Sequence, residues 1–186
     1  MYFIPDFVFD SIYEITPAFF REHGLRGMLI DLDGTMASSR APLPPPSVRP
    51  WLDGLQAAGI RVLVLSNNKE SRVQRFCAPL GVPFLHRAVK PLGVGFRRGA
   101  RALGLPLREI AVVGDQIYTD TLGGNRVGAV TCFVRSVNRN DFWIGLRHQL
   151  EKPFIALGRR KQESSNSPHP EATKPTGKKK RKGGRP

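Results

Sequence analysis

Four short apolar runs constrain the fold of this chain more than any other feature of its sequence. They cover residues 28–30, 60–65, 110–113 and 130–134, and the first three lead directly into polar residues. Continuous runs of this length are typical of parallel strands that are buried on both faces of a sheet. Residues 82–85 predict one further short strand.

Segments with helical character separate these runs. The expected helices cover residues 47–58, 69–80, 91–103 and 119–127, and each is followed by a glycine. Glycine just beyond a helix is a common C-terminal stop, although Pro79 is expected to end the second helix early. The alternation of strands and helices predicts an α/β protein with a three-layer, doubly wound parallel sheet.

Two segments of different composition flank the expected catalytic domain, residues 26–157. Residues 1–25 are rich in aromatic side chains, which either cover one edge of the sheet or lie at a membrane interface. Residues 158–186 are rich in Gly, Pro, Ser and Lys and carry more than half of the net charge of +14. Such a segment buries too little apolar surface to offset its ordering entropy, so we expect a disordered basic tail.

The remaining features favour a cytoplasmic protein. No run of about 18 apolar residues is present, so no transmembrane segment is expected, and the N-terminus lacks the positive region of a signal peptide. Cys77 and Cys132 form neither a metal-ligand pair nor a disulfide framework. We interpret both as small buried thiols, which suit a reducing compartment.

Polar side chains gather where the predicted strands end. Asp31 and Asp33 follow the first strand, Ser66 the second and Asp115 the third long one, while Lys90 falls just after the short strand. In open α/β sheets, ligands bind outside the carboxyl ends of the strands. We therefore expect these five side chains to converge on one site.

These residue types suit phosphoryl transfer, which needs a nucleophile, a cation and donors to the phosphate oxygens. Carboxylates are established nucleophiles in aspartyl-phosphate chemistry. Of two acids at i and i+2, one could attack while the other protonates the leaving oxygen and later activates water. Mg²⁺ prefers oxygen ligands, which Asp31, Asp115 and a backbone carbonyl would supply. Ser66 and Lys90 could bind the remaining phosphate oxygens.

In their order along the chain, these residues resemble the four motifs of the haloacid dehalogenase (HAD) superfamily. The motifs are Asp-Leu-Asp-Gly-Thr at 31–35, Ser66, Lys90 and Gly-Asp-Gln-Ile-Tyr-Thr-Asp at 114–120. The resemblance implies an HAD-like Rossmannoid fold and a Mg²⁺-dependent phosphatase.

The resemblance also implies a role for each residue. Asp31 would be the nucleophile and Asp33 the acid and base, while Ser66 would bind phosphate and Lys90 would hold nucleophile and phosphate together. Asn67, beside Ser66, is a further substrate-binding candidate. The implied metal ligands are Asp31, Asp33 through its backbone carbonyl, Asp115 and, in support, Asp120.

A closer likeness, over residues 4–137, is to the YqeG group of capless HAD phosphatases, which is similar to phosphatidylglycerophosphate phosphatases. The residues that carry it are 4–17, 88–91, 114–116, 119–120 and 123–126. The spacing agrees with a capless enzyme, because residues 36–46 and the short interval before Lys90 leave no room for a lid domain. An open site suits a phosphate on something large, and phosphatidylglycerophosphate at the inner membrane surface is the expected substrate.

Two alternatives stay open. One keeps the chemistry and changes the substrate to a soluble sugar, nucleotide or protein phosphate. The other is a non-catalytic nucleic-acid or ribosome-associated protein that uses the basic tail, because clustered Lys and Arg release counterions from phosphates. The tail would also attract an anionic lipid surface, and its lack of aromatic residues argues against a base-stacking platform.

Overall fold

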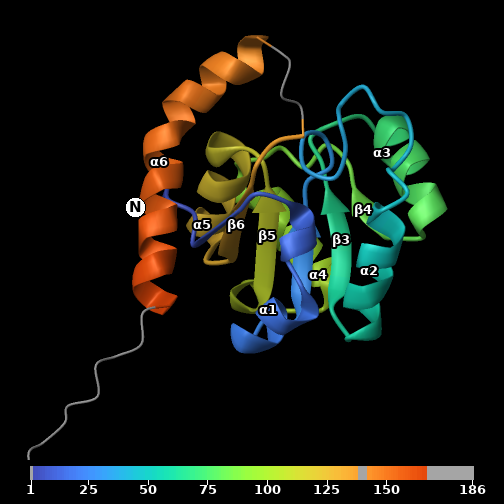
Figure 1. Cartoon of the computed structure of the whole chain (residues 1–186). Coiled ribbons are helices and arrows are strands. Elements are labelled where there is room, and N and C mark those ends of the chain that lie inside the picture. The colour runs from blue at the N-terminus through green and yellow to red at the C-terminus, as the bar shows by residue number, and fades with distance from the viewer. Residues whose placement is uncertain (1, 138–141, 167–186) are drawn as a thin grey trace, which may run out of the picture.

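The computed structural model describes residues 2–137 and 142–166, which form a sheet covered by helices (Figure 1). All six strands are parallel and lie in the order β1-β6-β5-β2-β3-β4. This confirms the predicted doubly wound α/β class. The strands are β1 Phe7–Phe9, β2 Gly27–Ile30, β3 Arg61–Leu65, β4 Phe84–Leu85, β5 Ile110–Gly114 and β6 Val130–Val134.

Helices cover both faces of the sheet. The α-helices are α1 Pro17–Glu22, α2 Val48–Ala57, α3 Glu70–Cys77, α4 Gly93–Leu103, α5 Leu122–Val127 and α6 Phe142–Asn166. Short 3₁₀ turns lie at Ile12–Glu14, Ala78–Leu80 and Leu107–Glu109, and a π-helical turn, η4, covers Ile117–Thr121. The end of α3 at Cys77 agrees with the expected stop before Pro79.

Alternate residues of the central strands fill two separate cores. Met28 and Ile30 of β2 belong to the core under α1, α2 and α3, whereas Leu29 belongs to the core under α4. Successive side chains of a strand point to opposite faces, so a strand between two helical layers must be apolar throughout. This explains why the runs read from the sequence are continuous rather than alternating.

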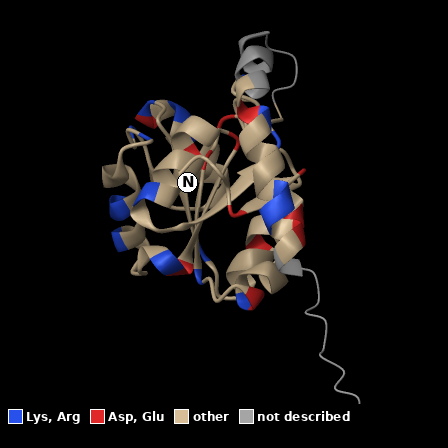
Figure 2. Cartoon of the chain, turned by 90° about the vertical axis from the view of Figure 1, so that its left-hand side faces the viewer, with Lys and Arg blue, Asp and Glu red and all other residues tan. Residues whose placement is uncertain are grey.

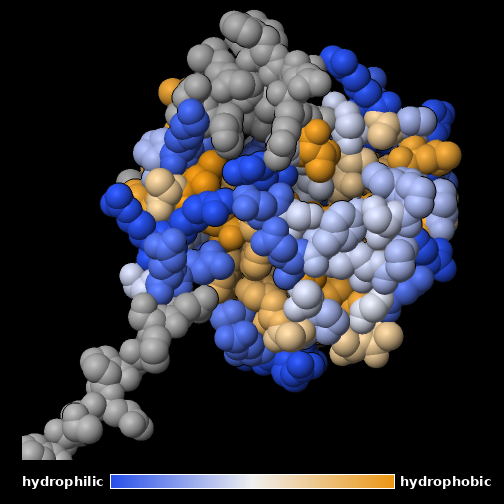
Figure 3. All heavy atoms as spheres, viewed as in Figure 1, coloured by the Kyte–Doolittle hydropathy of each residue, from blue (hydrophilic) through white to orange (hydrophobic). Residues whose placement is uncertain are grey.

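The N-terminal aromatic segment supplies a strand that the sequence did not predict. β1 pairs in parallel with β6 and forms one edge of the sheet. Phe19 of α1 packs edge-on against Phe7 and Phe9, with ring centroids 5.0 and 5.4 Å apart. Most of these aromatics therefore pack against the protein, while Tyr2 and Tyr13 stay exposed. On the face shown in Figure 3, hydrophobic side chains are interspersed with hydrophilic ones.

The expectation of a disordered tail from residue 158 onwards is wrong for residues 158–166, which continue α6. Arg159 pairs with Asp10 at 2.8 Å, and Lys161 pairs with Asp6 at 2.6 Å. The Gln162 side chain accepts the Val8 N–H at 2.9 Å. Contacts with the N-terminal strand therefore stabilise a segment whose composition alone predicts disorder. Figure 2 shows the mixed charges along this helix. Residues 167–186 of the expected tail lie outside the described residues.

None of the helices within the described ranges is long and apolar enough to cross a bilayer.

Candidate active site

The carboxyl ends of β2, β3 and β5 bring the predicted site residues to one edge of the sheet. Ile30 of β2 is in register with Val64 of β3 and with Val113 of β5. The Asp31 N–H continues this ladder by donating to the Val113 carbonyl at 2.8 Å. Residues that follow these strands therefore start from nearly the same level, which places Asp31 and Asp115 close together.

Lys90 forms two ion pairs inside this edge. Its Nζ atom donates to Oδ1 of Asp31 and to Oδ1 of Asp120, each at 2.6 Å, and its side chain is only 3% exposed. Burial by itself would lower the pKa of the Lys90 ammonium. The carboxylates of Asp120 and Asp31 outweigh burial and hold that pKa above its usual value, so Lys90 is a fixed positive charge.

The Asp31 carboxyl lies in a surrounding that disfavours its charge. Burial raises the pKa of Asp31 to about 7; Lys90 opposes this rise, and the nearby carboxylates of Asp120 and Asp115 add to it. A single ammonium therefore does not fully offset the negative charge gathered here. A further cation would stabilise the ionised form of the group.

Asp31, Asp115 and Asp120 form a cluster that fits such a cation. All three are buried, and one carboxylate oxygen from each lies within 4.8 Å of the others. The Thr35 hydroxyl lies 3.5 Å from both Asp31 and Asp115. Hard oxygen ligands of this kind suit Mg²⁺, which usually keeps several water ligands beside one or two carboxylates.

Two glycines make room for these carboxylates. Gly34 has a φ of +96°, and a Cβ atom there would lie 2.4 Å from Oδ2 of Asp115. A Cβ atom on Gly114 would lie 2.2 Å from Cγ of Asp120. Any side chain at either position would have to displace an acid of the cluster.

Asp33 faces a different set of partners. Its carboxylate accepts hydrogen bonds from Nη2 of Arg72 at 2.8 Å and from Nδ2 of Asn68 at 3.1 Å. Its side chain is 18% exposed, so it lies at the mouth of the site rather than inside the cluster. The two acids at i and i+2 thus have different surroundings, as a division of labour between them requires.

Asn67 fixes the backbone of Lys90 from both sides. Its Oδ1 atom accepts the Lys90 N–H at 2.7 Å, and its Nδ2 atom donates to the Lys90 carbonyl at 3.1 Å. The Lys90 loop is strained, because Arg87 and Val89 have φ values of +46° and +56°. Positive φ costs energy for any residue with a side chain, and most for a β-branched one such as Val89. Asn67 is predicted to bind substrate, yet in the structure its amide holds the backbone of Lys90. Ser66 is buried beside it, and its Oγ accepts the Asn68 N–H at 3.1 Å.

The supporting roles of four residues were not predicted from the sequence: Thr35, Asn68, Arg72 and Glu151. Glu151 of α6 is buried, and its carboxylate accepts the Ile117 N–H at 3.0 Å. Ile117 begins η4, which carries Asp120. The C-terminal helix therefore supports the acidic loop, a contact between distant segments that no local pattern predicts. Thr35 lies in the motif at 31–35 and Asn68 follows Asn67, and this proximity was the available signal for them.

Comparison with known proteins agrees with this geometry. The family described as haloacid dehalogenase-like hydrolase matches residues 16–128. The probable phosphatase YqeG of Bacillus subtilis is 37% identical over 161 residues, which cover 86% of this chain and 94% of that protein. Phosphatidylglycerophosphate phosphatase 1, chloroplastic/mitochondrial, of Arabidopsis thaliana is 27% identical over 153 residues, which cover 77% of this chain but 41% of the plant protein.

Among solved structures, the cobalt-bound deoxy-D-mannose-octulosonate 8-phosphate phosphatase of Haemophilus influenzae resembles this fold. The two chains are 14% identical and superpose with a TM-score of 0.52, over 78% of this chain and 95% of that one. At this identity the likeness shows the fold alone. The family match covers more than half of the sequence, and the probable phosphatase from Bacillus subtilis aligns with most of this chain. Together with the strand-end cluster, these findings show that this chain belongs to the haloacid dehalogenase-like hydrolases.

Proposed function

We propose that the chain is a Mg²⁺-dependent phosphomonoester hydrolase that forms a phospho-aspartate on Asp31. The observation that carries this proposal is the buried cluster in which Lys90 holds Asp31 at 2.6 Å beside Asp115 and Asp120. Lys90 fixes the direction of the Asp31 carboxylate and offers positive charge where a phosphate would lie. The phosphatase relative over most of the chain supports the same reaction class.

In the first half of the reaction, an oxygen of the Asp31 carboxylate attacks phosphorus. The bond between phosphorus and the ester oxygen breaks, and protonated Asp33 gives its proton to the departing alkoxide. Arg72 and Asn68 hold the Asp33 carboxyl in one orientation for this transfer. The products of this half are an alcohol and a phospho-aspartate.

In the second half, the Asp33 carboxylate takes a proton from water as the water oxygen attacks phosphorus. The bond between phosphorus and the Asp31 oxygen breaks, which returns the carboxylate and releases inorganic phosphate. Asp33 ends protonated and ready for the next turnover. Lys90 and Ser66 would bind the phosphate oxygens during both halves, since both are buried at the same edge.

The oxygen ligands available for Mg²⁺ are the carboxylates of Asp31, Asp115 and Asp120, together with the Asp33 backbone carbonyl that the family likeness implies. Mg²⁺ bound here supplies positive charge that offsets the charge of the transferred phosphoryl group. The side chain of Asp33 stays free of this cluster and available to move protons.

Phosphatidylglycerophosphate is the substrate that we propose, for hydrolysis to phosphatidylglycerol at a membrane surface. The plant relative named for this activity supports the proposal at 27% identity. An open site supports it too, since within the described residues no domain is inserted between β2 and α2 or between β3 and β4. A soluble phosphomonoester is the alternative substrate.

The test is Mg²⁺-dependent phosphate release from phosphatidylglycerophosphate in mixed micelles, beside a panel of soluble phosphomonoesters. We expect a kcat/KM on the lipid that is at least about tenfold higher than on any soluble ester, with no release in EDTA. Turnover confined to soluble esters would keep the Asp31 chemistry and reject the lipid. Absence of turnover on every ester would reject the enzyme itself.

A further inference from the structure

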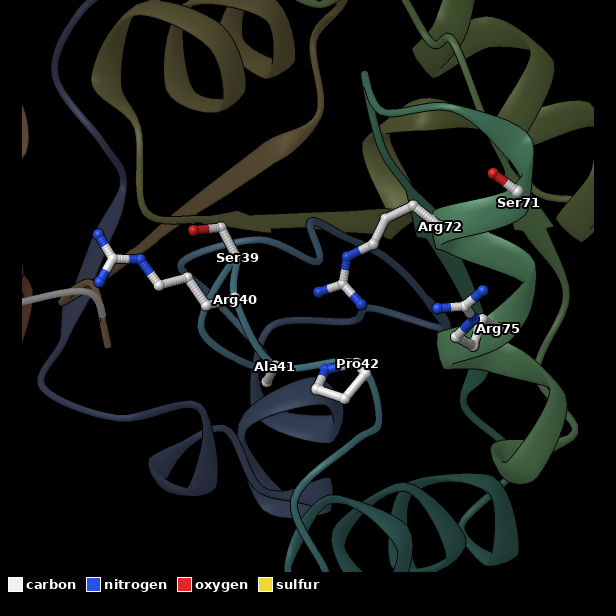
Figure 4. Close-up of a pocket in the computed structure, with 7 residues that line it drawn as sticks. All are labelled: Ser39, Arg40, Ala41, Pro42, Ser71, Arg72 and Arg75. Atoms are coloured by element: carbon white, nitrogen blue, oxygen red, sulfur yellow. The ribbon is translucent and has the colours of Figure 1, made fainter.

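An arginine-lined pocket lies beside the proposed acid and base. It has a volume of about 290 Å³. Its walls come from the loop after β2 and from α3, and every charged residue that lines it is an arginine (Figure 4). The lining includes Ala41 and Pro42 from the loop and Arg72 and Arg75 from α3.

Two of the arginines come from the same helix. The guanidinium of Arg72 extends from α3 toward Ala41 and Pro42, and Arg75 follows one turn later (Figure 4). Residues three positions apart lie on the same face of a helix. The guanidinium of Arg40, from the loop, extends away from this pair. The concentration of positive charge therefore lies on the α3 side of the pocket.

Arg72 connects the pocket to the reacting groups. Its Nη2 atom donates to Oδ1 of Asp33 at 2.8 Å and to the Ser38 carbonyl at 3.4 Å. Its Nε and Nη1 atoms are buried and have no hydrogen-bond partner among the described residues. A guanidinium has five N–H donors, and buried donors are normally paired. These two donors are themselves buried, so Arg72 acts on an anion in the pocket through its positive charge, whereas the exposed Arg75 offers its donors directly.

The position of Asp33 indicates which part of the substrate lies near the pocket. Asp33 protonates the leaving oxygen in the proposed reaction, so the alcohol part of the ester departs beside it. One hydrogen bond separates Asp33 from Arg72, and Arg72 forms a wall of the pocket. An alcohol that leaves beside Asp33 therefore lies next to the wall that Arg72 forms.

We propose that this pocket is a subsite for a second anionic group on the alcohol part of the substrate, either a phosphodiester or a carboxylate. Planar guanidinium groups suit both anions because they donate two parallel hydrogen bonds. The inference rests on the proposed function and goes beyond it: the enzyme selects phosphomonoesters whose leaving alcohol is itself negatively charged.

The experiment compares water-soluble esters, so that lipid packing plays no part. Glycerol 3-phosphate has a neutral leaving alcohol, glycerophosphoglycerol phosphate has one with a phosphodiester, and 3-phosphoglycerate has one with a carboxylate. We expect wild-type kcat/KM to be about tenfold higher for a charged alcohol than for glycerol, as one charge-assisted contact provides. The preferred anion, phosphodiester or carboxylate, identifies the ligand.

The matched variants are Arg75→Gln and Arg98→Gln, both replacing exposed arginines, on α3 and α4 respectively. Arg75→Gln should remove most of the preference for the charged alcohol, mainly through KM, and Arg75→Lys should restore part of it. Arg98→Gln should leave the preference as in the wild type, because Arg98 does not line the pocket.

Equal kcat/KM on charged and neutral alcohols in the wild type would overturn the subsite. So would a preference that Arg75→Gln leaves intact. Both outcomes are distinct from failure of the proposed function, which would appear as no turnover on any ester, p-nitrophenyl phosphate included, and would remove the subsite with it.

Discussion

Two neighbouring regions, the buried cluster around Lys90 and the arginine-lined pocket, differ in charge, burial and partners. Lys90 is 3% exposed, and two carboxylates accept hydrogen bonds from its single ammonium at 2.6 Å. The pocket beside it has arginines as its charged residues; Arg75 is exposed, and Arg72 pairs with Asp33 at the mouth of the site. The first region is rich in negative charge and closed, whereas the second is rich in positive charge and open.

Under the proposed function, this difference separates the chemistry from the choice of substrate. A buried charge is stable only when it is paired, so the side chains of the cluster depend on one another and tolerate little change. An exposed arginine is stabilised by water, so its replacement costs little stability. We therefore expect changes in the cluster to affect folding and rate together, and changes in the pocket to affect selectivity.

The largest expected effect comes from Lys90→Met. The variant leaves Asp31 and Asp120 buried without their cation, which costs about 3–5 kcal/mol of unfolding free energy. It should also lower turnover by about 10²–10³-fold, as loss of a positioned donor does. The measurement is urea unfolding in EDTA together with phosphate release in Mg²⁺. Arg75→Gln should change the unfolding free energy by less than about 0.5 kcal/mol. Equal losses of stability in both variants would contradict the difference between the buried cluster and the open pocket.

The close packing of the cluster is tested by Gly114→Ala. The new Cβ would lie 2.2 Å from Cγ of Asp120, so we expect a loss of about 1–3 kcal/mol and weaker activation by Mg²⁺. Gly54→Ala is the matched control, because no atom lies within 4 Å of its Cβ position. Gly54 is inside α2, so this change should stabilise the protein by about 0.5–1 kcal/mol. Thermal unfolding and Mg²⁺ titration of activity check both, and a silent Gly114→Ala would contradict the geometry.

A comparable loss of stability is expected from Glu151, which supports the cluster from α6. Glu151→Ala leaves the buried Ile117 N–H without this acceptor, which costs about 1–3 kcal/mol. Because Ile117 begins the turn that carries Asp120, the Mg²⁺ concentration for half-maximal activity should rise about tenfold. Glu151→Gln keeps an acceptor oxygen and should restore most of the Mg²⁺ response. Stability loss without any change in the Mg²⁺ response would limit Glu151 to a structural role.

The smallest effect concerns α3, whose two faces differ. Arg72 and Arg75 line the pocket, while Cys77 of the same helix is buried. Burial raises the pKa of Cys77 to about 12, from an ordinary value of 9.0. We therefore expect Cys77, like the buried Cys132, to resist an aromatic disulfide reagent at pH 8 in the native protein and to react in urea.

The same pKa shift gives a direction for stability. Between pH 9 and pH 12 the folded state keeps the Cys77 proton and the unfolded state loses it, so rising pH lowers the unfolding free energy. Fast labelling of Cys77 in the native protein at pH 8 would show that α3 opens, and α3 could then not form a fixed wall of the pocket.

Much of the site was predictable because strand ends and helix stops are local features. Asp31, Lys90 and Asp115 follow apolar runs, and parallel strands bring them together whatever the detailed packing. Arg72 could not be found in this way, since the sequence does not distinguish it from the other arginines of its helix. Its contact with Asp33 depends on how α3 packs against the sheet.

The errors at the two ends of the chain have a common cause. β1 is only three residues long and α6 is mixed in charge, so neither shows a clear period. Each is stabilised by the other through pairs such as Arg159 with Asp10. Contacts between segments this far apart in sequence are absent from any local pattern, and composition alone therefore favoured disorder for residues 158–166.

The most direct test of the account is phosphate release by Asp31→Asn in Mg²⁺, measured beside the wild type on the best ester of the panel. The amide keeps the size of the side chain but removes the nucleophilic carboxylate. We predict turnover at least about 10³-fold below the wild type, with an unchanged circular dichroism spectrum. Near-normal turnover by this variant would contradict the phospho-aspartate mechanism.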